Sequence, residues 1–115
     1  MEPQHFQVPD ELELEAFFGC EPVERAVDDG YWSYEVRCAG KITLRFSFQL
    51  PDRSVQTELR QGSTVLAVVC HEMATNLRVE NGELRCQFES RDSRGSLVIS
   101  AAEGYSVSWS TLRTE

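Results

Sequence analysis

Apolar residues follow two spacings along this sequence, and the change comes near residue 30. In the first part, three apolar residues recur at helical spacing: Leu14, Phe17 and Phe18. They predict one short amphipathic helix over residues 10–18, which would be marginal alone and needs a sheet to pack against. Residues 1–9 before it are expected to form a loosely held lead-in.

Both ends of the predicted helix carry boundary signals. Asp10 is a good N-cap, and Glu13 stands three residues later, at the spacing of a capping box. Gly19 favours a stop, because glycine readily adopts the left-handed conformation that ends many helices.

After residue 30 the apolar positions alternate with polar ones, which is the period of strands that bury one face. Turn signals recur about every 8 to 12 residues, and Asn81-Gly82 is the strongest hairpin dipeptide among them. Connections this short leave no room for parallel crossovers, so the strands should be antiparallel. About eight strands are predicted, over residues 31–38, 41–50, 53–61, 65–70, 77–79, 84–88, 97–101 and 105–109.

The strand over residues 65–70 is apolar on both faces, so we expect it to lie centrally in the sheet or beneath the helix. The whole pattern predicts a mainly β (α+β) single domain over residues 1–115, with antiparallel β structure over residues 31–110. The strands should form a meander folded into a sandwich or a partly open barrel, and the helix should cover one end or edge.

Charge is distributed unevenly along the chain. The 115 residues carry a formal net charge of -8. Nine of the 19 acidic residues lie in residues 1–30, where Arg25 is the single base, and the remaining residues balance. An acidic field of this kind would speed association with a basic partner. The alternative interpretation is a solvated helix face that keeps the chain in solution.

The acidic segment predicts a docking surface for one protein partner of basic character. Tyr31 directly follows Asp28, Asp29 and a glycine, and an aromatic residue beside acids is a common interface composition. We therefore expect Tyr31 or its neighbours to supply a buried anchor, while the carboxylates pair with Arg and Lys of the partner. The candidate partner-binding residues are Glu11, Glu15, Glu21, Glu24, Asp28, Asp29 and Tyr31.

The sequence contains no catalytic or metal-binding motif. Its four cysteines form no CxxC pair, and His71-Glu72 misses the HExxH zinc motif because Thr75 stands where the second histidine would bind. Cys70 and His71 are neighbours in a strand pattern, so their side chains should point to opposite faces and cannot readily share a proton. We predict no catalytic residue, no metal ion and no cofactor.

Two further classes of interaction are disfavoured. No apolar run approaches the roughly 18 to 20 residues that cross a bilayer, and the N-terminus lacks the basic and apolar regions of a signal peptide. Nucleic acid is a poor ligand for so acidic a chain, because phosphates are contacted mainly by Lys and Arg. We therefore expect a cytoplasmic protein that binds neither membrane nor nucleic acid.

Two stretches together carry a resemblance: the acidic residues 1–30 and the strand run from GKITLRFSFQL to GYSVSW. They resemble the small immunity proteins of bacterial polymorphic toxin systems. The resemblance implies a non-enzymatic protein that binds one cognate toxin tightly and blocks its active site or substrate cleft. Such toxins are often nucleases with basic clefts, which an acidic protein could occupy as a nucleic-acid mimic. The resemblance assigns no functional role to any particular residue of this sequence.

Alternatives from other classes remain at this point. The strands could close around an apolar cavity and make a small-molecule carrier, with the helix as a lid. A small enzyme could use carboxylates that the sheet brings together, although no spacing singles out a pair. An unpaired edge strand could also join two copies into a homodimer.

Overall fold

The computed structural model describes residues 6–91, 93–102 and 104–113. Its helix α1 spans Glu11–Phe18, as the apolar spacing predicted. A carboxylate oxygen of Asp10 accepts a hydrogen bond from the Glu13 amide at 2.8 Å, which caps the first turn. Gly19 ends the helix in the left-handed conformation, with φ of 70°, and its amide donates to the Glu15 carbonyl at 2.7 Å.

The strands form two antiparallel sheets, in agreement with the predicted mainly β (α+β) class. In the five-stranded sheet, strands lie in the order of the sequence: β1 (Glu24–Ala26), β2 (Tyr31–Arg37), β3 (Ile42–Gln49), β4 (Ser54–Gln61) and β5 (Thr64–His71). The four-stranded sheet repeats this arrangement with β6 (Ala74–Glu80), β7 (Glu83–Glu89), β8 (Ser93–Ser100) and β9 (Ser106–Arg113).

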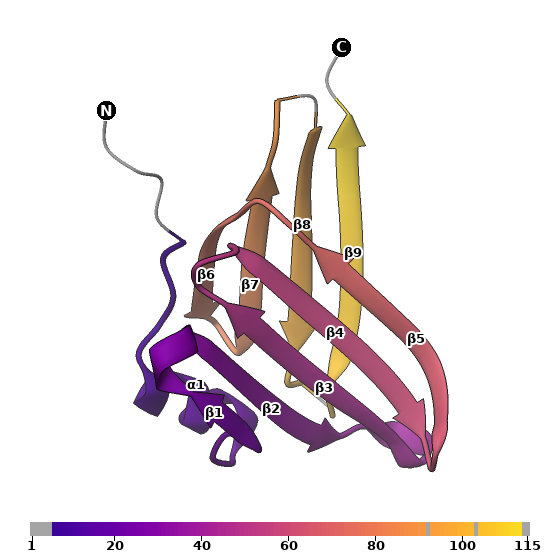
Figure 1. Ribbon diagram of the computed structural model, residues 1–115. Helices are drawn as coiled ribbons and strands as arrows, with labels where there is room; N and C mark the ends of the chain where they lie inside the picture. The colour runs from indigo at the N-terminus through magenta and orange to yellow at the C-terminus, as the bar shows by residue number, and fades with distance from the viewer. Residues whose placement is uncertain (1–5, 92, 103, 114–115) are drawn as a thin grey trace.

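The two sheets stack as a sandwich whose strands run at an angle to one another, and they do not close into a barrel (Figure 1). The chain passes from one sheet to the other between β5 and β6, where Met73 adopts a positive φ of 64°. Buried side chains from both inner faces fill the space between the sheets. The largest that are fully buried include Tyr34, Phe46, Leu44, Leu84, Leu97, Ile99 and Val55.

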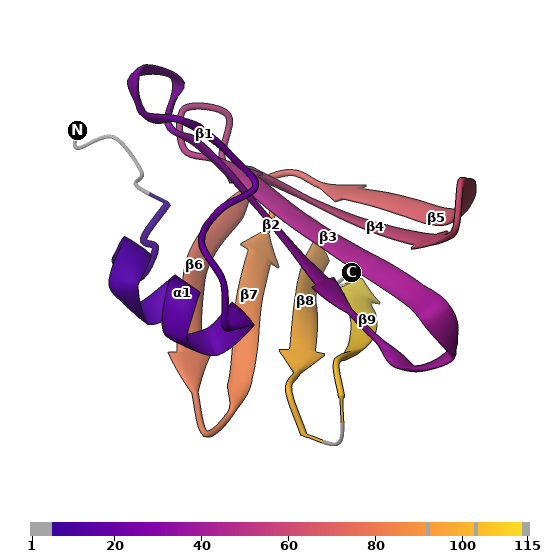
Figure 2. The ribbon, with the colours of Figure 1, turned by 90° about the horizontal axis from the view of Figure 1, so that it is seen from below.

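The helix closes one edge of this sandwich. It contacts β2 of the first sheet and β6 of the second, and Figure 2 shows it lying across the gap between them. Three buried side chains attach it: Leu14, Phe17 and Phe18. Phe18 stacks on Tyr34 with ring centroids 4.9 Å apart, so the helix that would be marginal alone is held by aromatic packing on the sheet.

Residues 6–9, the described part of the expected lead-in, lie along β6. The Gln7 amide donates to the Thr75 carbonyl at 3.2 Å, and the Leu77 amide donates to the Gln7 carbonyl at 2.7 Å. Phe6 is buried and meets Phe48 edge to face, with centroids 6.3 Å apart. These contacts carry the chain into the start of α1 next to the inner face of the first sheet.

The prediction of about eight antiparallel strands agrees with the structure, which differs from it in two details. The described chain has nine strands, because β1 pairs with β2 through Glu24 and Ser33 but spans three residues, too few to show an alternating pattern. The apolar strand expected to lie centrally is β5, which forms the edge of its sheet. Val65, Leu66 and Val68 are consequently about half exposed.

Candidate functional site

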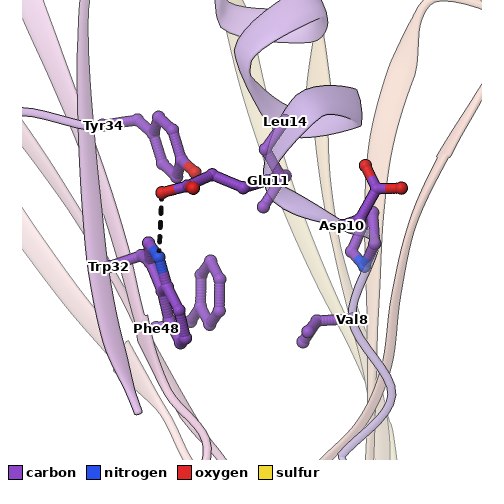
Figure 3. Close-up of a pocket in the computed structure, with 8 residues that line it drawn as sticks. Val8, Asp10, Glu11, Leu14, Trp32, Tyr34 and Phe48 are labelled. Atoms are coloured by element: carbon purple, nitrogen blue, oxygen red, sulfur yellow. Dashed lines mark hydrogen bonds between the residues drawn. The ribbon is translucent and has the colours of Figure 1, made fainter. Parts of the chain in front are cut away.

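An apolar pocket of about 220 Å³ opens at the seam between α1 and β2. We call it the seam pocket; its lining residues are Val8, Pro9, Asp10, Glu11, Leu14, Trp32, Tyr34 and Phe48. Figure 3 shows the Glu11 side chain extending from the start of α1 toward β2, with Val8 on the far side of the opening.

The aromatic wall of the seam pocket follows from the way side chains alternate between the two faces of a strand. Trp32 and Tyr34 are two residues apart on β2 and therefore share its inner face. Phe48 stands opposite Trp32 on β3, and the two rings stack with centroids 5.5 Å apart. The opposite wall comes from Leu14 of α1 and Val8 of the segment before it. The pocket thus depends on three parts of the chain that are distant in sequence.

Glu11 forms the polar edge of this pocket. Arg25 of β1 donates from Nε to Glu11 Oε1 at 2.6 Å, and its Nη2 lies 2.5 Å from the same oxygen. The indole Nε1–H of Trp32 also donates to Oε1, at 3.2 Å (Figure 3). One carboxylate oxygen therefore links the helix, β1 and β2.

Tyr34 contributes an unsatisfied polar atom. Its side chain is fully buried, and its hydroxyl has no hydrogen-bond partner among the described residues. Burial, followed by the carboxylates of Glu11 and Glu15, raises the pKa of Tyr34 to about 12. The hydroxyl is therefore protonated at neutral pH and can both donate and accept a hydrogen bond.

The predicted acidic residues lie on or beside α1 and β1. Glu15 is half-buried on the helix, and Glu24 forms an ion pair with Arg45 at 2.8 Å. Glu21, Asp28 and Asp29 are exposed and make no ion pair with any described residue; Asp28 and Asp29 belong to the short 3-10 turn Val27–Asp29. These carboxylates could meet a partner without breaking an internal pair.

Tyr31 is separated from the seam pocket. It begins β2 on the outer face of the sheet, since it alternates with Trp32, and it pairs in register with Ala26 and Gln49. There it lines a depression of about 240 Å³ together with Cys70 and Glu72. The structure therefore brings Glu11 and Trp32 together but leaves Tyr31 on the other face, and its role as an anchor stays a prediction.

Sequence reasoning did not single out Trp32 or Tyr34 as site residues. Both occupy the inward phase of a strand, a pattern typical of core residues, and Tyr34 is indeed in the core. The pattern cannot show that the sheet is left uncovered between the helix and residues 6–9. A signal for Trp32 existed, since it directly follows Tyr31 and stands three residues after Asp29.

The described residues offer no metal centre, because no three His, Cys, Asp or Glu side chains gather closely enough to hold an ion. His71 stacks on Phe88 with centroids 4.3 Å apart, and burial lowers its pKa. Cys70 points to the opposite face of β5, where its thiol donates to Gln56 Oε1 at 3.4 Å. None of the helices in the described chain is long and apolar enough to span a membrane.

Comparison with known proteins gives a fold likeness without a sequence family. No family model and no curated protein matches the sequence. The structure is similar to a chain of a contact-dependent growth inhibition toxin–immunity protein complex from Klebsiella pneumoniae 342, with a TM-score of 0.81. The two chains are 18% identical over 92% of this chain and 96% of that chain. The expected resemblance to immunity proteins is thus confirmed at the level of the fold.

Proposed function

We propose that this chain is a non-enzymatic immunity protein that binds one cognate toxin in the cytoplasm and blocks it. The observation that carries the proposal is the shared fold, which extends over nearly the whole length of a chain from a toxin–immunity protein complex. The basic character of the toxin and its nuclease-type activity belong to the same proposal.

Docking is assigned to an acidic surface formed by α1, β1 and the turn after it. Its residues are Glu11, Glu15, Glu21, Glu24, Asp28 and Asp29. Exposed carboxylates steer a basic partner during encounter, and they contribute more to the association rate than to the lifetime of the complex. Leu12, Val23 and Val27 are exposed apolar side chains among these acids and give the surface area that a partner can desolvate.

The experiment has two steps, so that capture of a protein alone does not decide it. The tagged chain is used to isolate a stoichiometric partner from its native host, and the partner's gene is then expressed in a test bacterium with and without this chain. We expect the partner alone to arrest growth and co-expression to restore it. Growth arrest by this chain alone, or a harmless partner, would contradict the proposal.

Neutralising part of the acidic surface tests where docking occurs. In the triple variant Glu24→Gln, Asp28→Asn, Asp29→Asn, we expect the association rate with the partner to fall about tenfold at low salt and to depend less on salt, because the steering charge is lost. Stopped-flow kinetics at several salt concentrations would measure both effects.

A control variant makes the same change in net charge elsewhere. Glu80→Gln, Glu83→Gln, Glu89→Gln removes three carboxylates from the four-stranded sheet, far from α1 in sequence. We expect this variant to associate at nearly the rate of the unmodified protein. Equal slowing by the two variants would mean that only total charge matters and that the acidic surface is not the docking site.

A small-molecule carrier is the second candidate function, and the apolar lining of the seam pocket favours it. Native mass spectrometry of the purified protein distinguishes it from the first. A retained non-protein molecule, displaced when the pocket is filled by Val8→Phe, would support the carrier. Absence of any retained mass would leave the immunity function as the better account.

A further inference from the structure

The seam pocket holds two oxygen atoms that lack partners. The contacts of the Glu11 carboxylate with Arg25 and Trp32 all fall on Oε1, which leaves Oε2 without a partner among the described residues. The Tyr34 hydroxyl, on a side chain that is fully buried, is likewise unpartnered. Figure 3 shows the Tyr34 hydroxyl directed toward the Glu11 carboxylate. The Glu11 side chain is 37% exposed, so water can reach its carboxylate, whereas the buried Tyr34 hydroxyl is costly unless a ligand satisfies it.

The rest of the pocket restricts the ligand by size and polarity. Its volume of about 220 Å³ exceeds the roughly 150 Å³ of an apolar cavity that holds benzene, so it admits one large side chain. The walls are aromatic on the side of β2 and β3 and aliphatic on the side of Val8 and Leu14. A long side chain with an apolar stem and a hydrogen-bonding end suits this lining.

The charge around the opening of the seam pocket determines which polar group a ligand can carry. Two carboxylates line the opening, from Asp10 and Glu11, and Arg25 forms an ion pair with Glu11. They repel an anion. A neutral apolar group would enter but would leave the buried Tyr34 hydroxyl unsatisfied. A cation with several N–H donors meets the two oxygens and the negative rim together.

We infer that the seam pocket receives an arginine side chain of the protein partner. Its guanidinium donates to Glu11 Oε2 and to the Tyr34 hydroxyl oxygen, and its plane lies against the aromatic wall. The aliphatic stem packs on Val8 and Leu14. A guanidinium is favoured over an ammonium because it is planar, weakly hydrated and able to stack while it donates several hydrogen bonds. This inference rests on the proposed function, since it names the group by which the partner is anchored.

A titration of the chain alone tests the pocket without the partner. The probes are N-acetyl-arginine amide, N-acetyl-lysine amide and N-acetyl-norleucine amide, and the readout is the indole N–H signal of Trp32 in a nitrogen-edited NMR spectrum. Trp109, whose indole does not line the pocket, serves as the internal reference. We expect a saturable shift of the Trp32 signal with the arginine probe, at millimolar concentration, and at least a fivefold weaker response to the lysine probe.

The other outcomes of this titration overturn the inference. An equal or larger response to the norleucine probe would show an apolar-ligand pocket, which favours the carrier. No response to any probe would show that the pocket does not bind a free side chain of this kind. Neither result depends on finding the partner, so the inference can fail while the proposed function stands.

Variants tested against the captured partner complete the experiment. Tyr34→Phe removes one hydroxyl and no described hydrogen bond, so the fold should be retained, and we expect the complex to dissociate five to tenfold faster. Thr57→Val is the matched control, because the Thr57 hydroxyl is also buried and unpartnered but lies outside the pocket. If both variants dissociate at the unmodified rate, the pocket is not the anchor, although neutralisation of the toxin would still establish the proposed function.

Discussion

His71 shows how the surroundings of one side chain set its chemistry. Its ring is stacked on Phe88, and its Nδ1 is buried without a hydrogen-bond partner. Burial lowers the pKa of this imidazole below its ordinary value of 6.5. The cause is desolvation, because partial burial disfavours the charged form of the ring. Glu72 and Glu89 line the depression beside it, at its solvent side.

A pH dependence of stability follows from this burial. The unfolded chain takes up a proton on His71 near pH 6.5, whereas the folded chain takes it up only at lower pH, so the free energy of unfolding should fall as pH drops below about 6.5. His71→Phe keeps an aromatic ring on Phe88 and removes the titrating group. We expect its unfolding midpoint to change less between pH 7.5 and pH 5.5 than that of the unmodified protein, as measured by thermal denaturation.

Every other ionisable residue is common to the two proteins, so the comparison isolates the contribution of His71. A parallel decline of the two midpoints with pH would mean that His71 is not the group responsible.

Among the elements, the turn between β1 and β2 is held by close contacts at Gly30. Gly30 adopts a φ of 65°, and its carbonyl accepts a hydrogen bond from the Leu50 amide at 2.9 Å. A Cβ built at Gly30 would lie 3.0 Å from Pro51 Cδ and 3.2 Å from Leu50 Cβ. The turn that carries Asp28 and Asp29 is therefore fixed against the loop that joins β3 to β4.

The variant Gly30→Ala should destabilise the protein for two reasons. A left-handed conformation costs a residue with a Cβ about 1–2 kcal/mol, and the close approach to Pro51 adds to this cost. Gly19→Ala is the matched control, because Gly19 also has a positive φ, of 70°, but nothing lies within 4 Å of its built Cβ. Urea denaturation should show a larger loss for Gly30→Ala, and equal losses would exclude a contribution from the contact.

Helices and strands could be predicted from the sequence where neighbouring residues determine them. The helix follows from its cap at Asp10 and its stop at Gly19, and most strands follow from alternation. The edge position of β5 could not be predicted, because a strand apolar on both faces is typical of the interior of a sheet. The seam pocket could not be predicted either, since Val8, Glu11 and Trp32 meet only after the two sheets have stacked.

At the scale of the whole molecule, β5 leaves an apolar edge on a strongly charged protein. The strand contains no Asp, Glu, Lys, Arg or Pro over its eight residues. It therefore lacks the charged side chains and prolines that normally prevent the edge strands of two molecules from pairing. Leu66 and Val68 are each 49% exposed on its outer face. The acidic surface lies at the opposite edge of the same sheet, where β1 is the outermost strand.

We expect this edge to cause self-association at high protein concentration. In the variant Val68→Lys, the new ammonium faces water beside Glu58, the register partner of residue 68 on β4, so the fold should be retained while edge pairing is opposed. Sedimentation equilibrium should show an average mass that rises with concentration for the unmodified chain and stays monomeric for Val68→Lys. A monomeric unmodified chain at millimolar concentration would contradict this expectation.

The order of strands has a consequence for the growing chain. Each strand pairs with its neighbours in sequence, so the five-stranded sheet contains everything it needs by the time His71 has been made. Its inner face, with Leu44, Phe46 and Phe48, is covered in part by Phe6 and Phe18, which are made earlier, and otherwise by strands that are synthesised later. During translation, a finished sheet therefore presents part of its apolar face to water. That interval makes the nascent protein a natural client of chaperones that shield apolar surface until the second sheet arrives.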